Sequence, residues 1–341
     1  MDRIAEHDML TIYDQLPDGL LDCDARHLHE ILPGPSLIHL PGLHPEALFV
    51  SVLLHGNETT GWDAVRELLR KYQRRGLPRA MCLFIGNVEA ARHAQRHLPG
   101  QPDYNRIWTA DEATPEHRMA QHLLGELARL DLFAAVDVHN NTGKNPHYAC
   151  VNRLEPDYLH LASLFSRTVV YFIKPDTVMS MAMAQFCPAV TIECGQPGVP
   201  QGMLHVLEFI DACLHLDHFP DHPVAAKELD LFHTVATVKI PLQLEFGFGE
   251  QGGDLCLLPD IDRLNFNELP AGTAFGQVRE ADFMPFDVRD EQGREASQRY
   301  FEINDRWVQT RVPVMPSMLT LDLDVIRQDC LCYLMERLAL T

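Results

Sequence analysis

Short apolar runs alternate with amphipathic segments along the first two thirds of the chain. Five of these runs have the length and the continuous apolar character of strands that a sheet buries on both faces, at residues 47–54, 80–85, 132–138, 169–173 and 188–192. Apolar residues at helical spacing lie between or after them, at residues 62–72, 116–130 and 203–216. Thr114 followed by Pro115 supplies the second of these helices with an N-cap and a first helical residue. Strands that alternate with helices predict an α/β fold, with a mixed, mostly parallel sheet that has helices on both faces.

The pattern changes after about residue 220, where Pro220, Pro223 and several charged residues end the α/β part. Alternating apolar and polar residues follow at 237–244 and 275–278, and Gly- and Asp-rich turns lie at 247–253 and 287–293. We therefore expect two domains, an α/β domain at 1–222 and a smaller β-rich domain at 223–341. The spacing of apolar residues at 324–338 predicts that a helix closes the second domain.

Composition narrows the classes of function. The chain has 48 Asp and Glu against 28 Lys and Arg, and the net charge of −20 disfavours binding to nucleic acid or anionic lipid. No apolar run approaches the roughly 20 residues of a membrane helix, and the first residues carry acids where a signal peptide is basic. We expect a cytoplasmic protein with neither nucleic-acid nor membrane partners. Its nine cysteines lack C-x-x-C spacing, which favours buried thiols over a zinc knuckle.

A histidine and a glutamate three residues apart on a tight turn can reach one cation. The chain has three such pairs, which are His27 with Glu30, His55 with Glu58 and His205 with Glu208. The third lies in a helical pattern and the first has no strand before it. The pair at 55–58 follows a predicted buried strand directly and precedes a predicted helix. Because ligands bind at the carboxyl ends of strands in open α/β sheets, His55 and Glu58 are the candidate metal ligands.

Two further strand ends carry polar residues. Asp137 and His139 lie two positions apart at the end of a predicted strand, so both side chains point to the same face. His139 is the candidate third ligand, and Asp137 is expected to hold a ligand imidazole through its other nitrogen. Two histidines and a glutamate leave a coordination position for water, which is typical of catalytic zinc. Glu193, at the third strand end, is the candidate base that takes the proton of that water and returns it to a leaving amine.

Together these motifs resemble the succinylglutamate desuccinylase/aspartoacylase family, which is related to the zinc carboxypeptidases. The resemblance rests on HGNE at 55–58, DVHNNT at 137–142 and TIECGQPGVPQG at 191–202. Residues 102–107 (PDYNRI) are similar to the family's D-[LM]-N-R segment, Gly86-Asn87 to its G-N-P turn and residues 264–266 weakly to its trailing β-domain. The resemblance implies a carboxypeptidase-like fold and one Zn²⁺ per chain, bound by His55, Glu58 and His139. It also implies amide hydrolysis with Glu193 as the general base and acid.

The resemblance further implies two kinds of substrate contact. Asn105 and Arg106 match the residues that hold the carboxylate of the amino-acid part, and a planar guanidinium suits that pairing. An arginine of the G-N-P region helps to polarise the scissile carbonyl in the family. The equivalent position here is Glu89, and Arg92 and Arg96 remain open as substitutes.

A second departure from the family concerns substrate choice. Better-known members have a substrate-reading arginine about ten residues before the base, and here that position is Met183, in a run that includes Met179. Methionines line adaptable apolar surfaces. We therefore expect a specificity pocket at Met179 and Met183. The expected substrate is an N-acyl amino acid more apolar than N-acetylaspartate or N-succinylglutamate. Ordinary core packing of the same methionines is the alternative.

The leading hypothesis is a zinc-dependent amide hydrolase that cleaves a small-molecule N-acyl amino acid to an amino acid and a carboxylic acid. A carboxypeptidase-type peptidase with the same metal is the nearest alternative. A non-catalytic metal-binding module is the alternative of another class, and Glu193 argues against it because a structural metal site needs no base. Assembly into a homo-oligomer is left open by the sequence.

Overall fold

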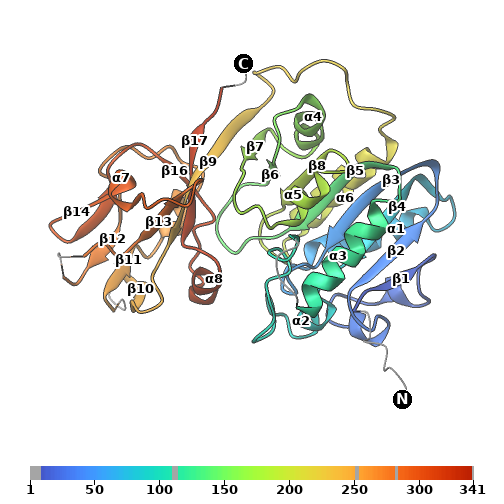
Figure 1. Cartoon of the computed structure of the whole chain (residues 1–341), viewed down its shortest axis with the longest axis horizontal. Helices are drawn as coiled ribbons and strands as arrows, with labels where there is room; N and C mark the ends of the chain where they lie inside the picture. Colours follow the sequence, from blue (N-terminus) through green and yellow to red (C-terminus); the bar gives the residue numbers. More distant parts are fainter. Residues whose placement is uncertain (1–8, 110–113, 250–252, 281–282, 340–341) are drawn as a thin grey trace. The chain divides into compact units, whose positions relative to one another are not determined.

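A mixed, mostly parallel sheet runs through the N-terminal two thirds of the chain, and a separate smaller sheet is formed by C-terminal strands (Figure 1). The computed structural model describes residues 9–109, 114–249, 253–280 and 283–339. Contacts divide the chain into two units. The first runs to Asn140 and includes Tyr148–Val169 and Lys174–Leu229, and the second includes Asn141–His147, Val170–Ile173 and the chain from Asp230 onward. The sequence-based boundary at 222/223 lies a few residues before this last division.

The sheet of the first unit has parallel strands at its centre. Its order is β1 (Thr11–Tyr13), β2 (Ser36–Leu40), β4 (Leu77–Ile85), β3 (Gly42–Val52), β5 (Leu132–His139), β8 (Ala189–Glu193), β6 (Tyr148–Val151) and β7 (Thr168–Tyr171). Strands β4, β3, β5 and β8 are parallel to their neighbours in that order, whereas β2 and β6 pair antiparallel with β4 and β8. The central strands are apolar and buried on both faces, as expected for strands covered by helices. The predicted fold class is therefore confirmed.

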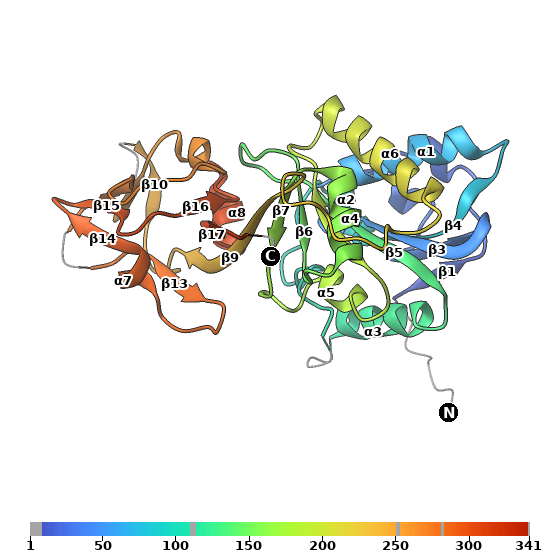
Figure 2. The same ribbon diagram turned by 90° about the horizontal axis from the view of Figure 1, so that it is seen from above.

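Helices cover both faces of this sheet (Figure 2). One face carries α1 (Thr60–Tyr72), α4 (Pro156–Phe165) and α6 (Pro200–His215), and the other carries α3 (Pro115–Leu127) and α5 (Met179–Met183). The short α2 (Val88–Arg92) follows β4, and two 3₁₀ turns, η1 (Leu20–Asp22) and η2 (Leu28–Glu30), precede β2. Gly61 lets α1 approach the sheet closely, because a Cβ there would lie 3.0 Å from side-chain atoms of Val52 and Val138.

Local signals located strands β3, β4, β5, β7 and β8 and helices α1, α3 and α6. The hydroxyl oxygen of Thr114 accepts the main-chain N–H of His117, as its predicted role as N-cap requires, and Pro115 begins α3. The helix ends at Leu127, three residues earlier than its apolar spacing indicated. Strands β1, β2 and β6 were not predicted. They are short, and their partners come from distant parts of the sequence, so no local period marks them.

The second unit is made of mostly antiparallel strands. In one group β9 (Asp230–Lys239) lies between β13 (Asp287–Asp290) and β17 (Cys332–Arg337), and β17 also pairs with β16 (Met315–Ser317). The smaller sheet has the order β10 (Phe246–Phe248), β11 (Leu255–Leu257), β12 (Ala274–Val278), β15 (Trp307–Thr310) and β14 (Phe301–Asn304). In the described part of this unit, the strands are connected by the short helices η4 (Ile261–Leu264), α7 (Ser297–Tyr300) and α8 (Leu323–Gln328).

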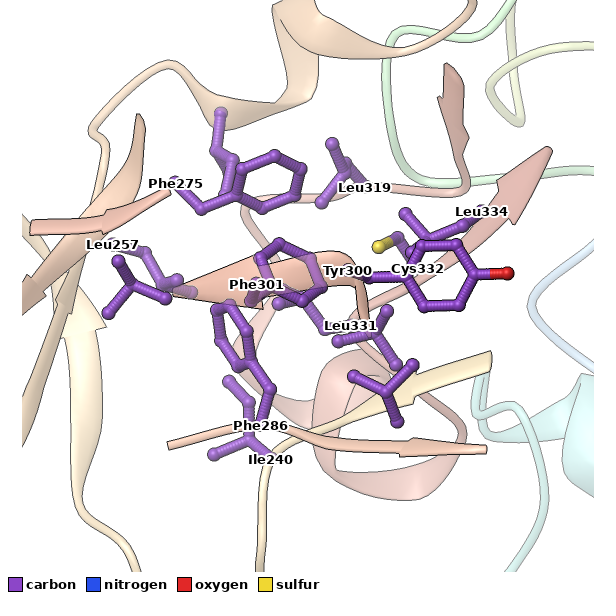
Figure 3. Packing of buried hydrophobic residues seen from close by; sticks show 14 of the residues in the cluster. Ile240, Leu257, Phe275, Phe286, Tyr300, Phe301, Leu319, Leu331, Cys332 and Leu334 are labelled. Atoms are coloured by element: carbon purple, nitrogen blue, oxygen red, sulfur yellow. The ribbon is translucent and has the colours of Figure 1, made fainter. Parts of the chain in front are cut away.

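Apolar side chains from both groups of strands form the core of this second unit (Figure 3). The ring of Phe301 meets the rings of Phe275 and Phe286 edge to face, with centroids 5.2 and 4.8 Å apart. Leu331 and Leu334 reach the same cluster from the C-terminal segment, and both are fully buried. Each such apolar side chain contributes about 1.5–3 kcal/mol when it is withdrawn from water, so the C-terminal segment is an integral part of this core.

The predicted closing helix at 324–338 is wrong. Helix α8 ends at Gln328, and the chain continues as strand β17, whose residues pair with β9 and β16. Cys332 and Leu334 alternate with the less buried Tyr333, which is the period of a strand. The edge of β9 offers main-chain hydrogen bonds that a local helical pattern cannot reveal. The predicted turn at 287–293 is also partly wrong, because β13 occupies its first four residues for the same reason.

Among the described helices, none combines the length and apolar character that crossing a bilayer requires.

Candidate metal centre and active site

Three neighbouring strand ends bring the predicted site residues together. His55 and Glu58 follow β3, His139 is the last residue of β5, and Glu193 is the last residue of β8. Strands β3, β5 and β8 are adjacent and parallel, so their carboxyl ends meet at one edge of the sheet. His139 and Glu193 are register partners, and side chains of register partners point to the same face. All four side chains are buried.

The two imidazoles and the carboxylate face one another directly. Nδ1 of His55 lies 2.8 Å from Oε1 of Glu58, and Nδ1 of His139 lies 2.9 Å from Oε2 of the same carboxylate. The candidate ligand atoms of the three residues all lie within 4.8 Å of one another, and within the described ranges no other group of His, Cys, Asp and Glu does so. Two imidazole nitrogens and a carboxylate are ligands that suit zinc. This donor set therefore fits a single divalent cation.

Each imidazole is held on its far side by another carboxylate. Nε2 of His55 lies 2.9 Å from Oδ1 of Asp103, and Nε2 of His139 lies 2.8 Å from Oδ2 of Asp137. Because an ionised carboxylate only accepts hydrogen bonds, both Nε2 atoms donate, and the Nδ1 lone pairs are left to face a cation. The structure thus places Asp137 as predicted for an orienting group. Asp103 was missed in that role, although it lies in the PDYNRI segment; nothing local links it to a histidine 48 residues away.

The other carboxylate oxygen of Asp137 is also held by a hydrogen bond. The hydroxyl of Ser51, on β3, donates to Oδ1 of Asp137, and these two residues are register partners on adjacent strands. Ser51 has no exposed surface. The result is a buried series of contacts from Ser51 through Asp137 to His139, and it leaves the carboxylate little freedom to turn away from the imidazole.

The carboxylates and imidazoles of the cluster shift one another's pKa values toward the charged forms. Burial raises the pKa of the Glu58 carboxyl, but the imidazoles of His55 and His139 outweigh burial and hold that pKa well below its usual range. Burial lowers the pKa of His139, but the carboxylates of Asp137 and Glu58 raise it well above its usual value. The pKa of His55 is raised by Glu58 and Asp103, against burial and the charge of Arg96. The carboxylates of the cluster therefore favour positive charge among them, which protons on the imidazoles or a bound cation can supply.

Arg96 is the arginine that the fold brings to this cluster. Its Nη1 lies 3.7 Å from Oε1 of Glu58, and its Nη2 donates to Oδ2 of Asp103 across 2.9 Å. Its main-chain carbonyl accepts the N–H of Gly56, which ties its loop to the turn between His55 and Glu58. Arg92, the other open candidate, pairs with Glu89 in a half-exposed contact on α2.

Gly56 has a steric reason for its place in the HGNE turn. A Cβ at this position would lie 2.2 Å from the main-chain carbon of Ala90 and 2.2 Å from the nitrogen of Ala91. These are backbone atoms of α2 and cannot move aside without shifting the helix. The turn that carries His55 and Glu58 therefore presses directly against α2, and only glycine fits.

Asn105 links the cluster to helix α5. Its Nδ2 lies 3.3 Å from Nε2 of His139, and its Oδ1 accepts the main-chain N–H of Met179 across 2.9 Å. Arg106 donates from Nη1 to the carbonyl of Asn105. Helix α5 packs against β5 and β8, and its Met179 and Met183 have no exposed surface. The methionines therefore lie on the strands that carry His139 and Glu193, as packed side chains.

The two other His-x-x-Glu pairs have different surroundings. His27 contacts Asp24 at an exposed position, with 2.7 Å between Nδ1 and Oδ1. His205 stacks on the ring of Phe165, with centroids 4.2 Å apart and rings nearly parallel. Neither histidine belongs to a group of potential metal ligands in the described part of the chain.

Comparisons with known proteins agree with this geometry. Residues 46–213 match the family model of the succinylglutamate desuccinylase/aspartoacylase catalytic domain. No curated protein matches the sequence. Among solved structures, the fold is similar to succinylglutamate desuccinylase from Vibrio parahaemolyticus, with a TM-score of 0.57, 15% identity, and 87% of this chain and 83% of that chain covered.

Two further solved structures share the fold. The desuccinylase from Chromobacterium violaceum has a TM-score of 0.54 and 17% identity, with 87% of each chain covered. Murine aminoacylase 3 has a TM-score of 0.55 and 15% identity, with 87% of this chain and 97% of that chain covered. Through residues 46–213, this chain therefore belongs to the succinylglutamate desuccinylase/aspartoacylase family.

Proposed function

We propose that the protein is a zinc-dependent deacylase that hydrolyses the amide bond of an N-acyl amino acid. The observation that carries this proposal is the meeting of His55, Glu58 and His139 at one buried point, with Glu193 as the register partner of His139. Three protein ligands leave a position for water, and a carboxylate beside them supplies the base that a structural metal site does not need.

His55 and His139 would hold zinc through Nδ1 and Glu58 through its carboxylate. When bound, zinc supplies a Lewis acid and lowers the pKa of water toward 7. The carboxylate of Glu193 takes a proton from the attacking water and later gives it to the departing amine nitrogen as the C–N bond breaks. The products are an amino acid and a carboxylic acid, and protons balance because the water supplies one hydrogen to each.

Arg96 is the cation that we assign to the negative charge developing on the amide oxygen. Its guanidinium lies beside Glu58 and is held in place by Asp103. A fixed cation in a buried site needs no reorganisation during the reaction, which is why such groups stabilise transition states strongly. Asn105 and Arg106 are the proposed contacts for the substrate carboxylate, where a planar guanidinium can pair with both oxygens.

We propose further that the substrate is an N-acyl amino acid more apolar than N-acetylaspartate or N-succinylglutamate. The support is Met183 on α5, at the position where better-known relatives have a substrate-reading arginine, together with Met179 one turn earlier. Both methionines are i, i+4 partners on one face of a short helix, and the main-chain N–H of Met179 donates to Oδ1 of Asn105. The buried thioethers at this position carry no charge that could pair with a second carboxylate.

A substrate panel tests the proposal. The purified protein is loaded with zinc, its metal content is measured, and it is assayed with N-acetyl, N-succinyl and longer-chain N-acyl amino acids, with dipeptides alongside. We expect hydrolysis of N-acyl amino acids that is lost on chelation and restored by zinc, with apolar substrates preferred. Faster cleavage of dipeptides would favour a peptidase, and full zinc loading without any hydrolysis would favour a non-catalytic metal-binding module.

A further inference from the structure

Asn140 directly follows His139 and makes contacts that the proposed reaction does not use. Its side chain is buried, with 3% of its surface exposed. The main-chain N–H of Asn140 donates to Oε2 of Glu58 across 3.0 Å. Its side-chain Oδ1 accepts the main-chain N–H of Thr60 across 3.2 Å, and its Nδ2 donates to the carbonyl of Gly195 across 2.7 Å. One residue thus contacts the segments that follow β3 and β8.

The contact with Thr60 supplies a capping hydrogen bond at the start of α1. Thr59 occupies the N-cap position of this helix, but its side chain makes no capping hydrogen bond. The first N–H groups of a helix have no partner within the helix and need one from elsewhere. Oδ1 of Asn140, which lies 80 residues along the chain, provides it for Thr60. The helix that begins two residues after Glu58 is therefore capped from the end of β5.

The contacts of Nδ2 hold the segment after Glu193. Besides the Gly195 carbonyl, this nitrogen lies 3.2 Å from Sγ of Cys194. The main-chain N–H and the thiol of Cys194 both donate to the carbonyl of His139, across 3.0 and 2.9 Å. The two residues after the candidate base are thus fastened to the end of β5 at several points.

We propose that Asn140 is a positioning residue, which through its two amide atoms sets the placement of the metal ligand Glu58 relative to the candidate base Glu193. An amide suits this task because it has an acceptor on one side and a donor on the other, both needed here at once. A carboxylate has no donor and an apolar side chain has neither. This inference rests on the proposed function only for its kinetic consequence; the consequence for metal binding stands without it.

The proposal predicts different losses for two substitutions. In Asn140→Ala the contacts of both amide atoms disappear, so the start of α1 and the Cys194-Gly195 segment are released. We expect the zinc dissociation constant to rise about 10-fold, in the range seen for groups that orient metal ligands. We expect kcat at saturating zinc to fall about 10-fold or more, with KM changed less than about twofold, because the base is displaced while the substrate contacts remain.

Asn140→Asp separates the two contacts. It keeps an oxygen for the Thr60 N–H, but it places an acceptor against the Gly195 carbonyl where a donor stood. We expect kcat to fall about as far as in Asn140→Ala, while zinc still binds stoichiometrically. Because this variant retains the cap of α1, it tests the proposal if Asn140→Ala does not fold.

Thr310→Val is the matched control. Its hydroxyl is fully buried in the second unit, donates to the carbonyl of Pro270 and accepts the N–H of Thr273. Like Asn140→Ala, it removes side-chain hydrogen bonds of a buried residue to the main chain, and we expect it to lower the melting temperature without changing zinc affinity or kcat.

Zinc affinity is measured by competition with a chelator, and the visible spectrum of the Co²⁺-loaded protein reports the geometry of the ligands. We expect Asn140→Ala to change both and Thr310→Val to change neither. If Asn140→Ala lowers only the melting temperature, as the control does, the residue is merely structural and the proposal fails. If the wild-type protein hydrolyses no N-acyl amino acid, the proposed function fails, while the Zn²⁺ and Co²⁺ measurements still decide the role of Asn140.

Discussion

Nε2 of His139 lies 2.8 Å from Oδ2 of Asp137, two residues earlier on the same strand. Because alternate residues of a strand share a face, β5 places the candidate ligand His139 and the carboxylate of Asp137 that orients it on the same face. The hydroxyl of Ser51 on the neighbouring strand holds the other carboxylate oxygen. The orientation of this imidazole is therefore built into the paired strands rather than into a loop.

Asp137→Asn tests this relationship. The amide can present its NH₂ group to Nε2 and disturb the tautomer that leaves Nδ1 for the metal. We expect zinc affinity to fall about 10- to 100-fold, measured by chelator competition. Asp211→Asn, which removes a carboxylate that contacts Lys71 and Tyr72 near the surface, is the control and should leave zinc affinity unchanged. Equal zinc affinity in Asp137→Asn and wild type would show that Asp137 does not orient the ligand.

Glu193→Gln tests the base. The amide is nearly the same size but cannot take a proton, so we expect stoichiometric zinc and a loss of kcat of at least about 100-fold. Metal analysis and steady-state kinetics measure the two quantities. Glu208→Gln, at an exposed position on α6, is the control. Near wild-type turnover in Glu193→Gln would place the base elsewhere.

Arg96→Met tests the stabilisation of negative charge. The methionine fills similar space without a cation, and we expect kcat to fall about 100- to 1000-fold while zinc remains bound. Arg92→Met removes a surface arginine four residues earlier that pairs with Glu89, and we expect it to keep full activity. If both variants were equally active, the charge on the amide oxygen would be met by another group.

Gly56→Ala tests the tight packing of the ligand turn. A Cβ here meets backbone atoms of Ala90 and Ala91 at 2.2 Å, so we expect destabilisation of several kcal/mol, on the order of an overpacked core site, together with weaker zinc binding. Gly125→Ala is the matched control, because nothing lies within 4 Å of a Cβ at this exposed position of α3. Its helix should gain about 0.5–1 kcal/mol. Thermal and denaturant unfolding measure both, and a Gly56→Ala protein as stable as wild type would contradict the close packing.

Removal of zinc gives a pH-dependent prediction. Without the metal, the carboxylates around His139 raise its pKa well above the usual value, despite burial. A raised pKa in the folded state contributes stability below the unfolded pKa of about 6.5, and this contribution is lost as pH rises through the folded pKa. The metal-free protein should thus lose stability toward alkaline pH.

Zinc should have the opposite trend, because its binding displaces protons from the imidazoles and its affinity rises with pH. Free zinc at 100 times its dissociation constant adds about 2.7 kcal/mol of stability. Melting temperatures with zinc and with chelator, measured across pH, should therefore diverge as pH increases. A constant difference would indicate that the imidazoles do not exchange protons for the metal.

Elements with a local signal could be predicted from the amino-acid sequence alone. Continuous apolar runs marked β3, β4, β5 and β8, because strands buried on both faces carry no polar interruption. Thr114 marked the start of α3, because a capping side chain acts within its own turn. The polar residues that close these strands, His139 and Glu193 among them, indicated a shared site because parallel strands end at the same edge.

Contacts between distant segments depend on the folded chain and could not be predicted from local patterns. The tertiary structure brought Asp103 to His55 and placed Arg96, rather than Arg92, beside Glu58, since the main-chain hydrogen bond from Gly56 to Arg96 fixes that loop next to the candidate ligands. It turned residues 332–337 from a predicted helix into β17, because hydrogen bonds to β9 and burial in the second core outweigh helical spacing. Local periodicity reports which face of a segment is apolar, whereas the identity of the partner depends on residues that fold against it from elsewhere in the chain.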